Sequence, residues 1–187
     1  MIECYAVLSM IIFYWLGALI NAIKYKGSRK AVWQFKIYSR KETAVCGLWL
    51  LVYAGLAWKA ACHDDLPALW TFMHTLKLFF ASALFLSAMF LTQWCYRVLG
   101  AQWQVSREIP ENYRLITEGP FKFLRHPIYF AQILIVAGCS VIFSDTAGWI
   151  LLILFLALVR YKSKLEERSM TDQFGDAYRE YKAKTLW

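Results

Sequence analysis

Long runs of apolar residues, separated by short charged segments, make up most of the chain. Three of these runs are close to the length that crosses a bilayer as a helix: residues 2–23, 44–62 and 68–94. A fourth run, residues 128–159, is too long for one crossing and is interrupted by Ser144-Asp145-Thr146, which predicts a tight turn between two helices. The pattern predicts an all-α integral membrane protein with about five transmembrane helices.

We expect one membrane domain, residues 1–187, in which residues 1–94 form three N-terminal spans. Residues 95–187 are expected to hold a polar connector from Tyr96 to Pro127, a helical hairpin and a polar tail. The first apolar run has no early basic segment and no small-residue cleavage site, so we interpret it as a retained helix and not as a signal peptide.

Lysine and arginine residues gather on one side of these predicted spans. Residues 24–41, 97–125 and 160–184 together hold 19 of the 21 lysines and arginines. By the positive-inside rule that side is the cytoplasm, so the N-terminus is expected outside and the C-terminus in the cytoplasm. The short loop at residues 63–67, on the other side, is acidic.

Composition and charge agree with a membrane protein. The chain is 59% hydrophobic and carries a net charge of +8, which we attribute to topology and to attraction by anionic lipid headgroups. Nucleic acid is not expected as a partner, because the aromatic residues lie mostly in or beside the predicted spans. The five cysteines include no CxxC pair, so neither a metal site nor a redox pair is predicted. The oligomeric state is left open, as are the roles of His74 and Lys77 in the third run.

A dense polar cluster at residues 118–127, Glu-Gly-Pro-Phe-Lys-Phe-Leu-Arg-His-Pro, marks the predicted functional site. Ionisable groups at a bilayer boundary are costly, so such a cluster predicts function. The pair Gly119-Pro120 breaks the chain, and Pro127 predicts the start of the next helix. The free N–H groups of that helix favour a carboxylate or another anion.

A second polar block, Glu166 to Tyr181, follows the last apolar run and is expected to continue its helix. Arg160, Lys164 and Glu167 are spaced i, i+4, i+7 and therefore share a helical face. Glu166 lies on the neighbouring face, where it could instead pair with Lys162. We expect the function to lie where the two polar blocks meet.

The order and spacing of these residues resemble the isoprenylcysteine carboxyl methyltransferase family. That family is part of a wider group of integral-membrane methyltransferases, which includes phospholipid N-methyltransferases. The resemblance covers about residues 115–184 and rests on one ordered series: Gly119-Pro120-x5-Arg125-His126-Pro127-x-Tyr129, Glu166-Glu167 and Phe174-Gly175-x2-Tyr178-x2-Tyr181. The chain departs from the family at Phe121 and Phe123, where tyrosines are frequent, and at Met170, where leucine is frequent.

The resemblance implies S-adenosylmethionine as methyl donor, bound on the cytoplasmic side in a pocket formed by the connector and the C-terminal segments. It implies a donor-binding role for a group of residues in the two blocks: Gly119, Pro120, His126, Pro127, Tyr129, Glu166, Glu167 and Tyr178. Tyr129 and Phe121 could wall the adenine. The acceptor is expected to be lipophilic and to come from the bilayer.

The expected catalytic residues depend on that acceptor. A carboxylate, such as that of a prenylated cysteine, needs no base but needs a cation to orient it, and Arg125 and Arg160 are the candidates. An amine acceptor needs a base, for which Glu167 is the nearest candidate.

Three functions stay open from the sequence. Methylation of a lipophilic carboxylate is favoured over phospholipid N-methylation, and both are favoured over a transport or assembly role without catalysis. A transporter predicts a polar series along the spans, where the sequence offers only His74, Lys77 and a few hydroxyls.

Overall fold

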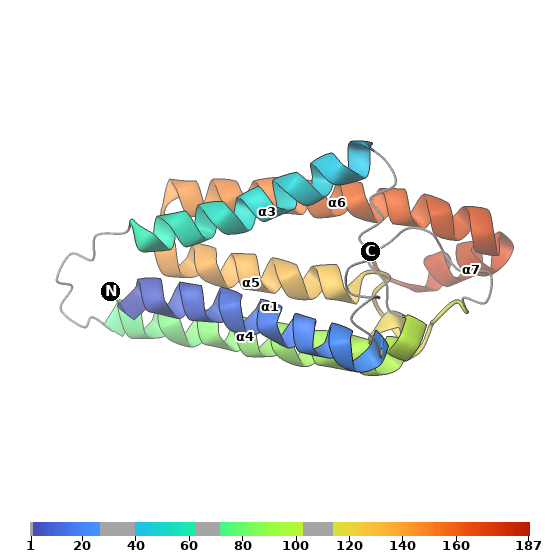
Figure 1. Ribbon diagram of the computed structural model, residues 1–187, viewed down its shortest axis with the longest axis horizontal. Coiled ribbons are helices and arrows are strands. Elements are labelled where there is room, and N and C mark those ends of the chain that lie inside the picture. Colours follow the sequence, from blue (N-terminus) through green and yellow to red (C-terminus); the bar gives the residue numbers. More distant parts are fainter. Residues whose placement is uncertain (1, 27–39, 63–71, 103–113) are drawn as a thin grey trace.

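The computed structural model describes residues 2–26, 40–62, 72–102 and 114–187. Five helices run side by side along the long axis of the molecule (Figure 1): α1 (Ile2–Lys26), α3 (Arg40–Ala61), α4 (Phe72–Leu99), α5 (Pro127–Phe143) and α6 (Thr146–Phe174). The short helix α7 (Asp176–Lys184) lies at one end of the bundle, together with the 3₁₀ turns η1 (Gly100–Gln102) and η2 (Gly119–Lys122). The described residues form no strand beyond one isolated bridge, Leu124 to Leu186, so the all-α prediction is confirmed.

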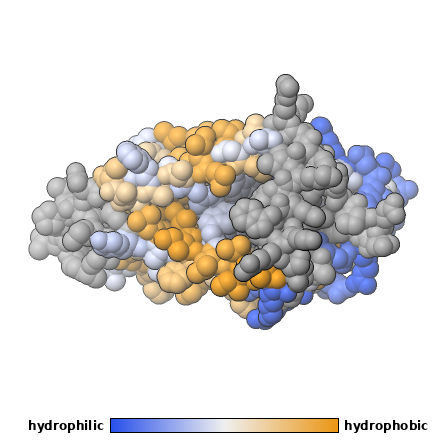
Figure 2. Space-filling model, viewed as in Figure 1, coloured by the Kyte–Doolittle hydropathy of each residue, from blue (hydrophilic) through white to orange (hydrophobic). Residues whose placement is uncertain are grey.

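The surface of the bundle is apolar, as a lipid-facing surface would be. Large hydrophobic side chains point outward along the helices, among them Leu50 with 67% of its surface exposed, Phe79 with 68% and Ile153 with 65%. Figure 2 shows this apolar band over the middle of the molecule and a hydrophilic region at the end that carries α7. Soluble proteins rarely expose apolar patches of this extent.

Three of the described helices are long and apolar enough to cross a membrane: Thr43–Ala61, Phe72–Leu99 and Thr146–Phe174. Two further apolar stretches, Tyr5–Asn21 and Pro127–Phe143, are shorter. The length and composition of these helices support the interpretation as a membrane protein. That all five helices cross the bilayer stays a prediction. The acidic loop predicted at residues 63–67 lies outside the described residues.

The connector begins later in the structure than the sequence predicted. The connector was expected from Tyr96, but α4 continues to Leu99 and is followed by η1. The reason is that Thr92, Cys95, Tyr96 and Leu99 are all buried, at a spacing of i, i+3, i+4, i+7 that keeps one helical face against the bundle.

The predicted turn between the last two long helices is confirmed. Ser144 caps the end of α5 in a left-handed conformation, with φ of 49°. Asp145 caps the start of α6 and accepts a hydrogen bond from the Gly148 N–H at 2.9 Å. Its carboxylate also forms an ion pair with Lys59 at the end of α3, which joins two antiparallel helices at this end of the bundle.

Small residues let α4 and α5 approach closely. Ala81 and Ala88 on α4 are fully buried, and a Cβ added at Gly138 on α5 would lie 3.4 Å from the backbone oxygen of Ala81. Close packing of small residues is how helices associate in lipid, where the hydrophobic effect gives little attraction between them. This contact fixes the position of α5, which begins at the candidate site.

Aromatic side chains join α3, α5 and α6 near the site. The Trp49 ring lies 4.9 Å from that of Phe155 and 5.4 Å from that of Tyr129, centroid to centroid. Rings at such distances and in tilted or edge-on arrangements attract one another beyond simple burial. Trp49 therefore supports Tyr129 from the interior of the bundle.

Candidate active site

The turn η2 brings the first polar block against α4. Gly119 has a φ of +58°, and a Cβ at this position would lie 2.7 Å from the Val98 Cγ2. Pro120 follows in the 3₁₀ turn and is buried. Both predicted donor-binding residues thus shape a turn packed on α4, and a direct contact of either with a donor stays a prediction.

His126 and Pro127 form the start of α5, as the sequence predicted. Pro127 is the first helical residue and is buried, while His126 stands at the N-cap with φ of −126° and ψ of 59°. The His126 side chain makes no capping hydrogen bond, so the first N–H groups of α5 are not capped by it. The His126 ring instead stacks on Tyr129, with centroids 5.5 Å apart and planes inclined by 14°.

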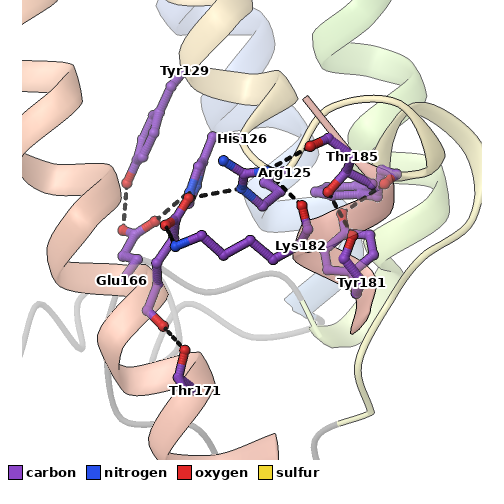
Figure 3. A network of polar contacts seen from close by, with 10 residues as sticks. Arg125, His126, Tyr129, Glu166, Thr171, Tyr181, Lys182 and Thr185 are labelled. Carbon is purple, nitrogen blue, oxygen red and sulfur yellow. Dashed lines mark hydrogen bonds and ion pairs between the residues drawn. The ribbon is translucent and has the colours of Figure 1, made fainter. Parts of the chain in front are cut away.

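The acidic pair on α6 lies directly against this helix start (Figure 3). Glu166 accepts a hydrogen bond from the Tyr129 hydroxyl at 2.5 Å, and its second oxygen lies 3.5 Å from His126 Nδ1. Glu167 Oε1 lies 3.6 Å from His126 Nε2. The imidazole therefore sits between two carboxylates, so the structure brings together four of the predicted residues.

Arg125 forms a buried ion pair with Glu167. Its Nε donates to Glu167 Oε1 at 2.8 Å, and the side chains of both residues are about nine-tenths buried. The same guanidinium donates to two backbone carbonyls of the tail, those of Lys182 at 3.2 Å and Thr185 at 2.6 Å. Arg125 thus joins α6 to the segment after α7.

The tail is also attached through its backbone. The Arg125 N–H donates to the carbonyls of Leu186 and Trp187 at 3.0 and 3.1 Å, and the Leu186 N–H donates to the Phe123 carbonyl at 2.9 Å. The Tyr181 hydroxyl donates to the Phe121 carbonyl at 2.6 Å. The two polar blocks therefore meet as predicted, through contacts between residues 42 (Arg125 and Glu167) and 60 (Phe121 and Tyr181) positions apart in sequence.

The electrostatics of the site favour a charged imidazole. Burial of His126 acts to lower its pKa, but the hydrogen bonding and the negative charges of Glu166 and Glu167 outweigh this and hold the pKa above the ordinary value for histidine. A protonated His126 between the two carboxylates compensates part of their charge.

Of the three α6 residues predicted to share a helical face, Arg160, Lys164 and Glu167, only Glu167 is buried. Arg160 and Lys164 are exposed, whereas only 8% of the Glu167 side chain is accessible. Glu167 is buried because α7 folds back along α6 and brings Lys182 to its second oxygen. Arg160 lies outside the cluster around His126, so its expected role as an acceptor-orienting cation has no support in the geometry.

Tyr178 is buried at the base of α7, with its ring centroid 5.8 Å from that of Tyr181. Its predicted contact with a donor stays untested. The break that produces α7 is where the sequence predicted it, since α6 ends at Phe174 and Gly175 has a φ of +53°.

Sequence reasoning missed two contributors to the site, Lys182 and the carbonyl of Thr185. The pairing of Lys162 with Glu166, which their i, i+4 spacing offered as an alternative, is present, with the charged atoms 3.5 Å apart. Lys182 could not be found in this way, because its contact with Glu167 depends on the turn at Gly175 and on a backbone fold that no side-chain pattern encodes.

An open depression lies beside the acidic pair, between α6 and α7. It has a volume of about 380 Å³ and is lined by Lys164, Glu167, Arg168, Thr171, Asp172 and Lys182. All six lining residues are polar or charged, and the depression lies on the side of Glu167 that faces Lys182.

A comparison with protein families identifies the family of this chain. The sequence profile described as "Phospholipid methyltransferase" matches residues 76–177, which is 102 of the 187 residues. The chain belongs to the phospholipid methyltransferase family. The matched region begins within α4 and ends in α7, so it contains the first polar block and the second as far as residue 177. No match was found among curated proteins.

Membership of the phospholipid methyltransferase family confirms the resemblance to integral-membrane methyltransferases. It identifies the chain as a membrane methyltransferase at that general level.

Proposed function

We propose that this protein transfers a methyl group from S-adenosylmethionine to a lipophilic acceptor that enters from the bilayer. One observation carries the proposal: the acidic pair of Glu166, which is partly buried, and Glu167, which is buried, lies against His126 and the start of α5 at one end of an apolar bundle. By the distribution of lysine and arginine, this end faces the cytoplasm, where a soluble donor is available.

The chemistry of these side chains fits the donor. Its carboxylate suits the N-terminus of α5, where N–H groups and the positive end of the helix dipole are not capped by His126. Its ammonium and ribose hydroxyls suit the carboxylates of Glu166 and Glu167. His126 Nε2 is buried and makes no hydrogen bond within the described residues, and the carboxylate beside it, Glu167 Oε1, lies 3.6 Å away.

When bound, S-adenosylmethionine supplies a methyl group on a positively charged sulfur. The residues of this chain then have to align the acceptor and exclude water. Tyr129 and His126 present a pair of stacked rings, and an aromatic face suits a sulfonium. Arg125 acts here as a positioning residue, since its donors hold Glu167 and the tail.

The geometry favours a carboxylate acceptor. An anionic oxygen attacks a methyl group without loss of a proton, so no base is required. Glu167, the base expected for an amine, is held by Arg125 and Lys182, and these two cations stabilise its charged form and weaken it as a base. A lipophilic carboxylate, such as that of a prenylcysteine, is therefore our first candidate.

Phospholipid N-methylation is the second candidate, and the family match favours it. An amine acceptor must lose a proton, and Glu166 is the better placed of the two carboxylates because 27% of its side chain is accessible, against 8% for Glu167. A third function, transport or assembly without catalysis, predicts no binding of the donor.

Calorimetric titration of the detergent-solubilised protein with S-adenosylhomocysteine tests the proposal. We expect saturable binding that the substitution His126→Ala weakens by about tenfold or more, because one charge-assisted hydrogen bond is worth on the order of 1.5–3 kcal/mol. Methyl transfer to a prenylcysteine analogue and to phosphatidylethanolamine then separates the two acceptors. A folded protein that does not bind S-adenosylhomocysteine would contradict the proposed function.

A further inference from the structure

A buried lysine borders the acidic pair on its membrane side. Lys162 lies on α6 one turn before Glu166, and only 8% of its surface is accessible. Its neighbours Tyr161 and Lys164 are exposed, as is Arg160. A lysine in such a position is costly to bury, so its ammonium is expected to have a use.

The ammonium of Lys162 is poorly satisfied. Its Nζ lies 3.5 Å from Glu166 Oε1, which is longer than the 2.7–2.9 Å typical of a charge-assisted hydrogen bond. The same carboxylate oxygen already accepts the Tyr129 hydroxyl at 2.5 Å. Among the residues that the structure describes, Nζ has no closer polar partner, although an ammonium carries three donors.

The position of Lys162 separates it from the donor side of the site. Four residues of α-helix rise about 6 Å, so Lys162 is displaced by that distance from Glu166 toward the apolar part of α6. From Thr146 to Val159 that part of α6 contains no ionisable residue. Lys162 is therefore the first buried charge that a molecule entering from the hydrocarbon region meets along this helix.

We propose that Lys162 binds the anionic oxygens of the lipid acceptor and orients them toward the acidic pair. This inference rests on the proposed methyltransferase function and adds to it the residue that recognises the acceptor. Arg125 and Arg160 are less suited to this task, because the first is held by Glu167 and the tail and the second is exposed. The anionic oxygens belong either to a carboxylate that is itself methylated or to the phosphate of a phospholipid headgroup.

Binding experiments distinguish these two sources. The full-length protein, saturated with S-adenosylhomocysteine, is titrated with a prenylcysteine analogue as the free acid and as its neutral methyl ester. It is also titrated in mixed micelles with phosphatidylethanolamine and with diacylglycerol, which lacks the phosphate. A preference for the acid identifies the carboxylate, and a preference for phosphatidylethanolamine identifies the phosphate; the absence of both preferences would overturn the inference.

The substitution Lys162→Met is expected to abolish the preference and to raise the acceptor KM by roughly tenfold or more, the loss of one charge-assisted hydrogen bond. Affinity for S-adenosylhomocysteine should be unchanged, and Lys162→Arg should restore most of the acceptor affinity. Lys184→Met, at an exposed lysine of α7, is the matched control and should leave both quantities unchanged.

Two results would overturn the inference while leaving the proposed function intact. One is an acceptor KM that Lys162→Met does not change. The other is an equal loss of affinity for S-adenosylhomocysteine and acceptor, which would assign Lys162 to the donor. If Lys162→Met does not fold, the acceptor KM of Lys162→Gln is measured in its place. The preference of the unmodified protein for the acid over the ester then tests the same inference without a substitution. Failure of the unmodified protein to bind S-adenosylhomocysteine would instead reject the proposed function.

Discussion

Arg125 and Glu167 show how the role of a residue changes once its partners are known. In the sequence, Arg125 stands beside His126 as a free cation at a helix start. In the structure its guanidinium is shared between Glu167 and the carbonyls of Lys182 and Thr185. Breaking a buried ion pair by removing one partner leaves the other charge uncompensated, so both residues are expected to matter for stability as well as for ligand binding.

The acidic pair gives the first prediction at this scale. We expect Glu167→Gln to lower donor affinity and turnover by about tenfold or more, because a buried charge-assisted hydrogen bond network is lost. Glu166→Gln should have a comparable or milder effect, since Glu166 is the more accessible of the two. Glu180→Gln, at an exposed position of α7, is the control. Full methyl transfer in both variants would mean that the pair is structural.

His126 gives a prediction for the dependence on pH. Its pKa in the folded protein is raised above the ordinary value of about 6.5. Its charged form therefore stabilises the folded state fully below that ordinary value, and this contribution is lost as the pH rises through the raised pKa.

Thermal unfolding of the unmodified protein and of His126→Gln, followed across this pH range in detergent, measures the effect. The difference in midpoint between the two should be largest at the acid end and should shrink as the pH increases. A difference that grows with pH would contradict the assignment of a raised pKa.

At the scale of elements, the turn η2 depends on a glycine. Gly119→Ala should destabilise the protein, because φ is +58° and the new Cβ would lie 2.7 Å from Val98 Cγ2. Gly100 has a similar φ of +52°, but a Cβ there would meet no other atom. Gly100→Ala should therefore lower the free energy of unfolding only by the backbone strain, about 1–2 kcal/mol. Gly47→Ala, within α3 and with no atom near the new Cβ, should stabilise the helix by roughly 0.5–1 kcal/mol.

Unfolding followed by tryptophan fluorescence measures these three variants. The expected order of stability is Gly47→Ala, then Gly100→Ala, then Gly119→Ala. An unchanged Gly119→Ala would show that η2 is not packed on α4 as described.

Most element boundaries near the site could be predicted because they depend on local chemistry. Pro127 begins α5, Asp145 caps α6 and Gly175 ends it, each for a reason visible in the sequence. The rotation of α6 could not be predicted in the same way. The spacing of Arg160 and Glu167 is compatible with one face, but α7 covers only Glu167, and this follows from tertiary folding.

The tail illustrates a second limit of sequence reasoning. Thr185 and Leu186 contribute backbone carbonyls to Arg125, and a carbonyl carries no sequence signal. The site was therefore predictable in its charged side chains and not in the main-chain groups that hold them. Lys162 was predictable in part: its i, i+4 spacing to Glu166 can be read from the sequence, but its burial cannot.

At the scale of the whole molecule, the two ends of the bundle are chemically different, and topology can be tested directly. We expect Ser144, which is exposed in the turn between α5 and α6, to face the outside, and Lys184 on α7 to face the cytoplasm. In a Cys62→Ser background, which removes an exposed cysteine, Ser144→Cys should react with an impermeant maleimide added to intact cells. Lys184→Cys should react only after permeabilisation, and the reverse pattern would contradict the orientation.

The unbroken course of α6 has a consequence for the lipid in which the protein works. The helix runs from the Asp145 cap past Glu166 to Phe174. At 1.5 Å per residue, Asp145 and Glu166 are about 31 Å apart, close to the hydrocarbon thickness of about 30 Å. A rigid helix cannot stretch, so a thicker or thinner bilayer must tilt it or deform around it. In vesicles of graded acyl-chain length, methyl transfer is therefore expected to pass through a maximum where the thickness matches this distance.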